Sequence, residues 1–199
     1  LRSGADVTLN TFVADSAAEA AQVYPANYWY SLLEVPDAEE FPGTGPDGNG
    51  ISEGMRSQSQ WIDMTKQGCQ LCHQLGNKAT RTLDHLSHLD FDSSVEAWQY
   101  RTAMGIRGPF MSSFVGRFGP RGMKMYADWT DRIAAGETPP APERPSGLER
   151  NVVLTLWDWG NESSYIHDEI TTDKRDPTLN AGGYAVSYTH LRAHETRNN

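Results

Sequence analysis

The residues of this chain that are best suited to chemistry are Cys69, Cys72 and His73, which form a Cys-x-x-Cys-His motif. At this spacing two thiols can add to the vinyl groups of a haem, and the adjoining imidazole can ligate its iron. The chain has two cysteines in all, and both belong to the motif. The motif therefore predicts one covalent haem c, with thioether bonds from Cys69 and Cys72 and with His73 as an axial iron ligand.

Three other interpretations of the motif stay open. A structural zinc site needs about four thiolate or imidazole ligands, and the sequence has no second cysteine pair. A thioredoxin-like redox pair needs a βαβ setting, whereas the residues around the motif indicate a helix followed by a turn. A plain disulfide with a histidine after it by chance needs no cofactor at all. Haem c is preferred because it gives every residue of the motif a role.

The second axial ligand decides what the iron can do. A thioether raises the reduction potential, a second imidazole lowers it, and an open position admits a small ligand. We predict Met111 as this ligand, because it follows Gly108 and Pro109 in an expected loop over 107–114, where a sulfur can point at a ring without breaking a helix. The alternatives are His85, His88, Met104, Met123 and Met125.

A haem also needs an apolar pocket that keeps water away from the ring. Aromatic residues at helical spacing are ordinary core residues too, and both roles are compatible in a small haem domain. The expected pocket residues are Trp61, Leu75, Phe110, Phe114 and Trp129.

Helices are the elements expected to position these residues. Apolar residues in a polar background predict a helix over 54–66 that leads to the motif. A second helix is predicted over 94–104, after an N-cap serine, and a third over 119–135, before Gly136. One face of the third helix carries Met125, Tyr126, Trp129 and Ile133.

With this layout, residues 54–136 resemble a class I cytochrome c domain, which has a helix before Cys-x-x-Cys-His, a methionine loop and a closing aromatic helix. The resemblance implies a mainly α fold, namely a small helical domain around a covalent haem, flanked here by truncated β segments. In class I cytochromes the axial methionine usually lies further from the histidine and is often followed by proline. Here Met111 is 38 residues beyond His73 and is preceded by Pro109-Phe110.

The whole chain is also similar to part of large secreted bacterial proteins. These place a carboxypeptidase-regulatory-like β-sandwich before such a haem domain and a β-propeller, similar to streptogramin-lyase propellers, after it. The expected segments are a terminal strand of the upstream sandwich (1–13), a helical and loop connector (14–53), the haem domain (54–136), a proline-rich linker (137–150), the start of a truncated β-domain for which a propeller is the candidate (151–185), and a scar (186–199).

The last of these segments resembles a translated sequencing adapter, and we expect it to be a scar of cloning or assembly. His190, His194 and Glu195 have a spacing that on a helix would suggest a metal site. We do not propose one, because all three lie within this scar. We expect the chain to be a fragment, with any targeting signal upstream of Leu1.

Residues 41–50 are dense in turn-forming residues. The segment also resembles an acidic calcium loop, but Asp47 is its one acidic side chain. Calcium needs about six to eight oxygen ligands. We therefore expect a covering loop.

The chain is acidic, with a formal net charge of −9 over 199 residues, which argues against a nucleic acid partner. No apolar run approaches the ~20 residues that a membrane span requires. Bacteria form haem thioethers outside the cytoplasm, where both sulfurs must be reduced at the moment of reaction. We therefore expect a periplasmic or secreted location.

Three functions are compatible with a single haem c. The first is an electron-transfer domain that cycles between Fe(III) and Fe(II) and docks a redox partner protein. The second is the electron-accepting module of an oxidoreductase or lyase-like enzyme, fused to a catalytic domain in the missing propeller. The third is a haem-based sensor with an open coordination position. The sequence shows no catalytic constellation of its own, so we do not expect this chain to be an enzyme by itself.

Overall fold

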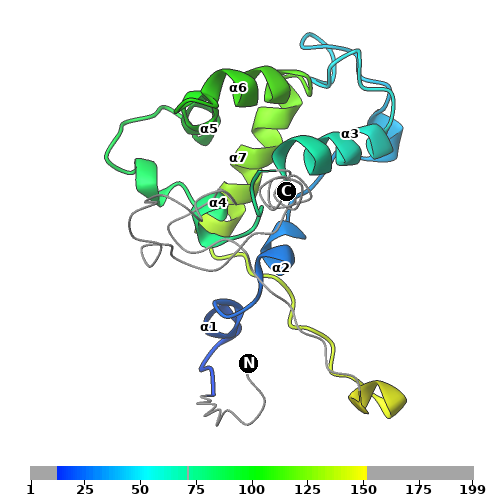
Figure 1. The fold of residues 1–199 in the computed structure, drawn as a ribbon, viewed down its shortest axis with the longest axis vertical. Coiled ribbons are helices and arrows are strands. Elements are labelled where there is room, and N and C mark those ends of the chain that lie inside the picture. Colours follow the sequence, from blue (N-terminus) through cyan, green and yellow to red (C-terminus); the bar gives the residue numbers. More distant parts are fainter. Residues whose placement is uncertain (1–12, 71, 152–199) are drawn as a thin grey trace, which may run out of the picture.

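The computed structural model describes residues 13–70 and 72–151. Helices are the only regular secondary structure in these residues, so the mainly α fold predicted from the sequence is confirmed (Figure 1). The β segments expected at 1–13 and 151–185 lie outside the described residues, except for Val13 and Asn151, and neither of these two is in a strand. The expected scar over 186–199 lies outside them as well.

Seven α-helices and four shorter helical turns make up the described part. The α-helices are α1 (Ala17–Ala21), α2 (Ala26–Tyr30), α3 (Gln58–Met64), α4 (Lys78–Arg81), α5 (Ser94–Ala103), α6 (Gly108–Gly116) and α7 (Pro120–Ala134). The shorter turns are the 3-10 helices η1 (Ala38–Glu40), η3 (Asp84–Leu86) and η4 (Gly147–Asn151) and the π-helical turn η2 (Thr65–Cys69). Helices α5, α6 and α7 pack against one another, and η2 continues α3 (Figure 1).

The helices predicted over 94–104 and 119–135 are confirmed as α5 and α7. Ser93 caps α5, because its hydroxyl oxygen accepts a hydrogen bond of 3.2 Å from the backbone N–H of Glu96. Pro120 opens α7 directly after Gly119, whose φ of 81° is one that glycine adopts without strain. The apolar face of α7 is buried as predicted, at Met125, Tyr126 and Trp129.

The helix expected over 54–66 begins later and runs further than predicted. Ser57 caps α3, and its hydroxyl oxygen accepts a hydrogen bond of 3.2 Å from the backbone N–H of Gln60. Met55 lies before the helix and is buried in the core. Because η2 follows α3 without a break, helical structure reaches the first cysteine of the motif, Cys69.

Helix α6 corrects the expectation of a loop over 107–114. Pro109 lies in the first turn of this helix, where its missing N–H removes no intrahelical hydrogen bond. The backbone N–H of Met111 donates to the carbonyl oxygen of Arg107 at 2.9 Å, as helical geometry requires. The prediction that Met111 lies in a loop is therefore wrong.

A single hydrophobic core joins the expected connector to the expected haem domain. Leu33 and Ile51 of the connector belong to the same cluster of buried side chains as Trp61 and Trp129. Trp61 is fully buried and meets the ring of Phe118 edge-on, with 4.6 Å between the ring centroids. The connector thus supplies part of the core that supports the motif.

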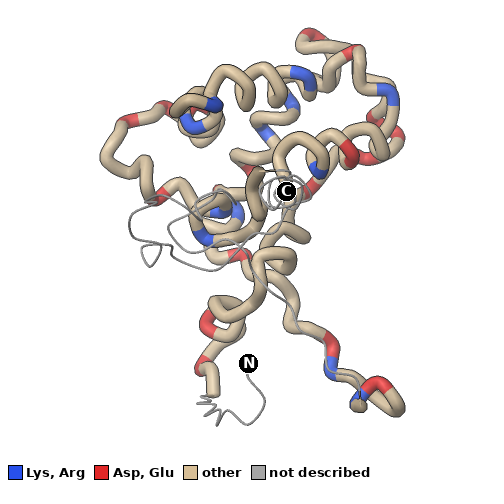
Figure 2. Tube along the Cα trace, viewed as in Figure 1, with Lys and Arg blue, Asp and Glu red and all other residues tan. Residues whose placement is uncertain are grey.

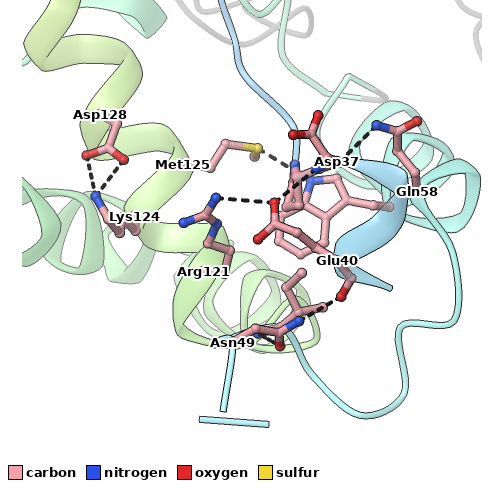
Figure 3. Close-up of polar contacts among 11 residues, drawn as sticks. Asp37, Glu40, Asn49, Gln58, Arg121, Lys124, Met125 and Asp128 are labelled. Carbon is pink, nitrogen blue, oxygen red and sulfur yellow. Dashed lines mark hydrogen bonds and ion pairs between the residues drawn. The ribbon is translucent and has the colours of Figure 1, made fainter. Parts of the chain in front are cut away.

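The loop over 41–50 is organised by the side chain of Asn49 (Figure 3). Its Oδ1 accepts hydrogen bonds from the backbone N–H groups of Thr44 and Ile51 at 3.0 and 3.1 Å, and its Nδ2 donates to the carbonyl oxygen of Glu40 at 2.7 Å. Arg121 of α7 forms an ion pair of 3.5 Å with the Glu40 carboxylate. These contacts hold the loop against the start of α7.

Residues 13–55 carry acidic side chains and no Lys or Arg, whereas both signs of charge are spread over the helices that follow (Figure 2). No helix within residues 13–70 and 72–151 is both long enough and apolar enough to cross a bilayer.

Candidate functional site

Cys69, Cys72 and His73 lie in one turn of the backbone at the end of η2, which we name the attachment turn. The backbone N–H groups of Cys72 and His73 both donate to the carbonyl oxygen of Cys69, at 3.2 and 2.9 Å. No disulfide joins Cys69 to Cys72. The turn therefore carries two thiols and an imidazole within five residues, the set that covalent haem attachment requires.

The sulfur of Cys69 faces the closing helix. Its Sγ lies 3.2 Å from the hydroxyl oxygen of Tyr126, a buried residue of α7 whose ring stacks on Trp98 with 5.1 Å between centroids. Burial raises the pKa of the Cys69 thiol, the hydrogen bond from Tyr126 lowers it, and the nearby charge of Cys72 raises it, with burial the largest effect. Burial also raises the pKa of Tyr126 well above its ordinary value, so both groups are neutral at pH 7.

The chain segment that follows the motif is held in place by contacts with α2 of the connector. Helix α2 approaches Gly76 so closely that a Cβ there would overlap the carbonyl oxygen of Ala26. Nη1 of Arg81 donates to the carbonyl oxygen of Gly76 at 2.7 Å, and the Arg81 guanidinium lies 4.1 Å from the centroid of the Trp29 ring. These contacts fix the path of the chain three residues beyond His73.

The same segment is held from α5 by Arg101, which is also buried. Its Nη1 donates to the carbonyl oxygens of Thr80 and Thr82 at 3.2 and 3.1 Å, and its Nη2 donates to that of Ala79. Hydrogen bonds from a charged donor are among the stronger ones in proteins. The attachment turn is therefore followed by a segment that two buried arginines hold in place.

Helix α6, which carries the predicted second ligand, lies against the residue before the motif. Gly68 has no room for a Cβ, because the ring of Phe114 occupies that position. Met111 lies on the same helix, one turn before Phe114, and is half-buried. The fold thus brings the helix of Met111 to the attachment turn.

The alternative ligands lie in different surroundings. The Sδ of Met125 is in the core and accepts a hydrogen bond of 3.4 Å from Nε1 of Trp61 (Figure 3). Met104, at the end of α5, is exposed, and so are His85 and His88. Met123 is half-buried on α7.

The expected pocket residues divide into enclosed and accessible ones. Trp61 and Trp129 are completely buried among protein side chains, and Leu75 is nearly so. Phe114 is half-buried, and Phe110 is 55% exposed.

Exposed apolar side chains are concentrated where α5 passes into α6. Of seven large apolar side chains that are exposed in the described residues, four lie between positions 100 and 110. Such a concentration commonly marks a surface that another group covers. The four residues are Tyr100, Met104, Ile106 and Phe110.

A surface pocket of about 400 Å³ lies beside the attachment turn but does not include it. Its walls come from α3, η2 and α6, and six of its eight lining residues are polar or charged. The lining residues are Ser57, Ser59, Gln60, Asp63, Met64, Gln67, Phe114 and Arg117.

Among the described residues, no group of three or more His, Cys, Asp or Glu side chains could hold a metal ion. The zinc interpretation of the motif therefore finds no further ligands in this part of the chain. A haem needs no such group, because the porphyrin supplies four of the iron ligands.

Tyr126, Gly76 and Arg101 support the motif without having been predicted to do so. The sequence places Tyr126 correctly on the apolar face of the closing helix. Its contact with Cys69 spans 57 residues, and no local pattern indicates such a pairing. The close approach of α2 to Gly76 likewise joins segments that no local pattern pairs.

Comparisons of the chain with protein-family models, with curated proteins and with solved structures find no match in any of the three. The assignment of a function rests on the motif and its surroundings.

Proposed function

We propose that residues 54–136 form a haem c-binding electron-transfer domain of a periplasmic or secreted multidomain protein. The attachment turn carries this proposal, because Cys69, Cys72 and His73 lie in one turn of the backbone and no disulfide joins the two cysteines. When bound, a haem supplies reversible one-electron chemistry between Fe(III) and Fe(II). Cys69 and Cys72 would hold it by thioethers, and His73 would ligate the iron.

Two features of the described residues fit such a group. Both cysteines are present as thiols, which is the form that adds to a vinyl group. The four exposed apolar side chains between positions 100 and 110 offer a surface of the kind that a large apolar ring covers. One of them, Phe110, lies on α6, the helix whose Phe114 meets Gly68 directly before the motif.

We also propose Met111 as the second axial ligand. It lies on the helix that contacts the attachment turn, whereas the sulfur of Met125 already accepts a hydrogen bond from Trp61 in the core. A methionine thioether favours Fe(II) and excludes water from the iron. Both effects suit an electron carrier that docks a redox partner protein.

Spectroscopy of the full chain, purified from a bacterial host that attaches haem c, tests this function. We expect a reduced-minus-oxidised spectrum typical of haem c, with a weak charge-transfer band near the red edge that indicates His/Met ligation. Met111→Ala removes this band and opens the iron to carbon monoxide, while Val23→Ala, at an exposed position of the connector, leaves both properties unchanged. Carbon monoxide binding to the wild-type protein would contradict the electron carrier and favour a ligand sensor.

A further inference from the structure

The contact between Cys69 and Tyr126 has no part in haem attachment as described above. The hydroxyl oxygen of Tyr126 lies 3.2 Å from the Cys69 sulfur. Tyr126 is 3% exposed, its ring stacks on Trp98, and its hydroxyl also meets the side chain of Thr65. Packing of the ring and the contact with Thr65 together fix the hydroxyl of Tyr126 beside the sulfur.

Outside the cytoplasm, a Cys-x-x-Cys pair can also react in a second way, by forming a disulfide. The two thiols give up two protons and two electrons to a disulfide oxidant such as oxidised glutathione, which is reduced to two glutathione thiols. A disulfide bond is about 2.05 Å long, so the sulfur of Cys69 would have to turn to that of Cys72. Neither sulfur can add to a vinyl group while that bond exists.

We infer that Tyr126 is a positioning residue that holds the Cys69 sulfur as a thiol and so disfavours a disulfide between Cys69 and Cys72. The hydrogen bond is made in the dithiol form and is given up when the sulfur closes the disulfide. A contact made in one redox form alone stabilises that form. The Tyr126 hydroxyl thus shifts the equilibrium toward two thiols.

The consequence for maturation follows from the proposed function. In an oxidising compartment the attachment turn would keep both sulfurs available for thioether formation. The shift of the thiol–disulfide equilibrium itself does not depend on haem, because it concerns the protein before attachment.

The equilibrium constant for disulfide formation in glutathione buffers tests the inference. The full chain is prepared without haem, equilibrated at pH 7, quenched with acid and analysed by alkylation and mass spectrometry. Tyr126→Phe removes one oxygen and keeps the ring that stacks on Trp98. We expect this substitution to favour the disulfide by about fivefold, the factor that an ordinary hydrogen bond contributes. Tyr100→Phe, at a tyrosine of α5 that is 44% exposed, leaves the constant unchanged.

An unchanged constant in Tyr126→Phe, with the helix content of the wild type by circular dichroism, would overturn the inference. If Tyr126→Phe loses helix content, the inference is tested instead by comparing the folded wild type with the wild type denatured in urea. The equilibrium constant for disulfide formation should be lower in the folded wild type than in denaturing urea, where the contact with Tyr126 is absent. A folded constant equal to or above the denatured one would overturn the inference. Failure of the wild type to acquire haem would contradict the proposed function and would leave this measurement valid.

Discussion

The indole nitrogen of Trp129 donates a hydrogen bond of 3.0 Å to the carbonyl oxygen of Trp29, 100 residues earlier in the chain. The bond joins α7, which carries the partner of Cys69, to α2, which packs against Gly76 just after the motif. Both tryptophans are buried, but the indole N–H of Trp29 has no acceptor within residues 13–70 and 72–151. The support of the attachment turn therefore includes a helix that precedes the expected haem domain.

Replacing each of these tryptophans by phenylalanine measures what the bond contributes. The carbonyl oxygen of Trp29 also accepts a hydrogen bond of 3.3 Å from the backbone N–H of Leu32, so Trp129→Phe removes one of its two donors. We expect this loss to cost about 1 kcal/mol beyond the loss of ring volume. Trp29→Phe removes a donor that has no acceptor among the described residues, so its cost comes from ring packing and from the contact with the Arg81 guanidinium. We expect urea denaturation to show a larger fall in the free energy of unfolding for Trp129→Phe. Equal falls would show that the bond does not stabilise the fold.

Alanine at Gly76 tests the close approach of α2 to the segment after the motif. Gly76 and Gly136 have φ angles of 98° and 100°, so alanine costs about 1–2 kcal/mol at either position for the left-handed backbone. At Gly76 the new methyl group also meets the carbonyl of Ala26, whereas at Gly136 it meets no atom within 4 Å. We expect Gly76→Ala to lower the melting temperature far more than Gly136→Ala. Similar melting temperatures would contradict the packing of α2.

The buried thiol of Cys69 predicts a dependence of stability on pH. Its pKa is raised mainly by burial above the ordinary value of 9.0, so near that pH the folded protein binds more protons than the unfolded chain. The stabilising contribution is complete below the ordinary pKa and is lost as the pH rises through the raised one. We therefore expect the free energy of unfolding of the haem-free chain to fall between about pH 8 and pH 10.

Cys69→Ala is the comparison for this prediction, because it removes the titrating group and leaves Cys72 in place. Urea denaturation at a series of pH values should give a smaller fall for the variant than for the wild type. The measurements stay below pH 10, since the raised pKa of Tyr126 acts in the same direction above it. Parallel pH profiles for the two proteins would contradict the burial of this thiol.

Much of the helical layout could be predicted from local signals. Ser93 as a cap and the apolar positions of α7 identify two helices to within one residue at each end. The error at α6 has a local cause as well. Gly108 and Pro109 indicate a chain break, yet proline is favoured in the first turn of a helix.

The motif of the candidate site could be predicted from the sequence, whereas the contacts around the motif could not. Five consecutive residues define the attachment turn, and local chemistry is enough to read them. The contacts of Phe114 with Gly68 and of Tyr126 with Cys69 join segments far apart in the sequence. Such contacts depend on how the helices pack, which residue spacing does not encode.

The intact mass of the chain under denaturing conditions tests the central claim most directly. The wild type and the Cys69→Ala/Cys72→Ala variant are expressed in a host that attaches haem c and that loads a known cytochrome in parallel. We expect the wild type to carry the additional mass of one haem that denaturation does not release, and the double variant to carry none. A wild-type chain of unmodified mass from a host that loads the known cytochrome would contradict the assignment of haem c.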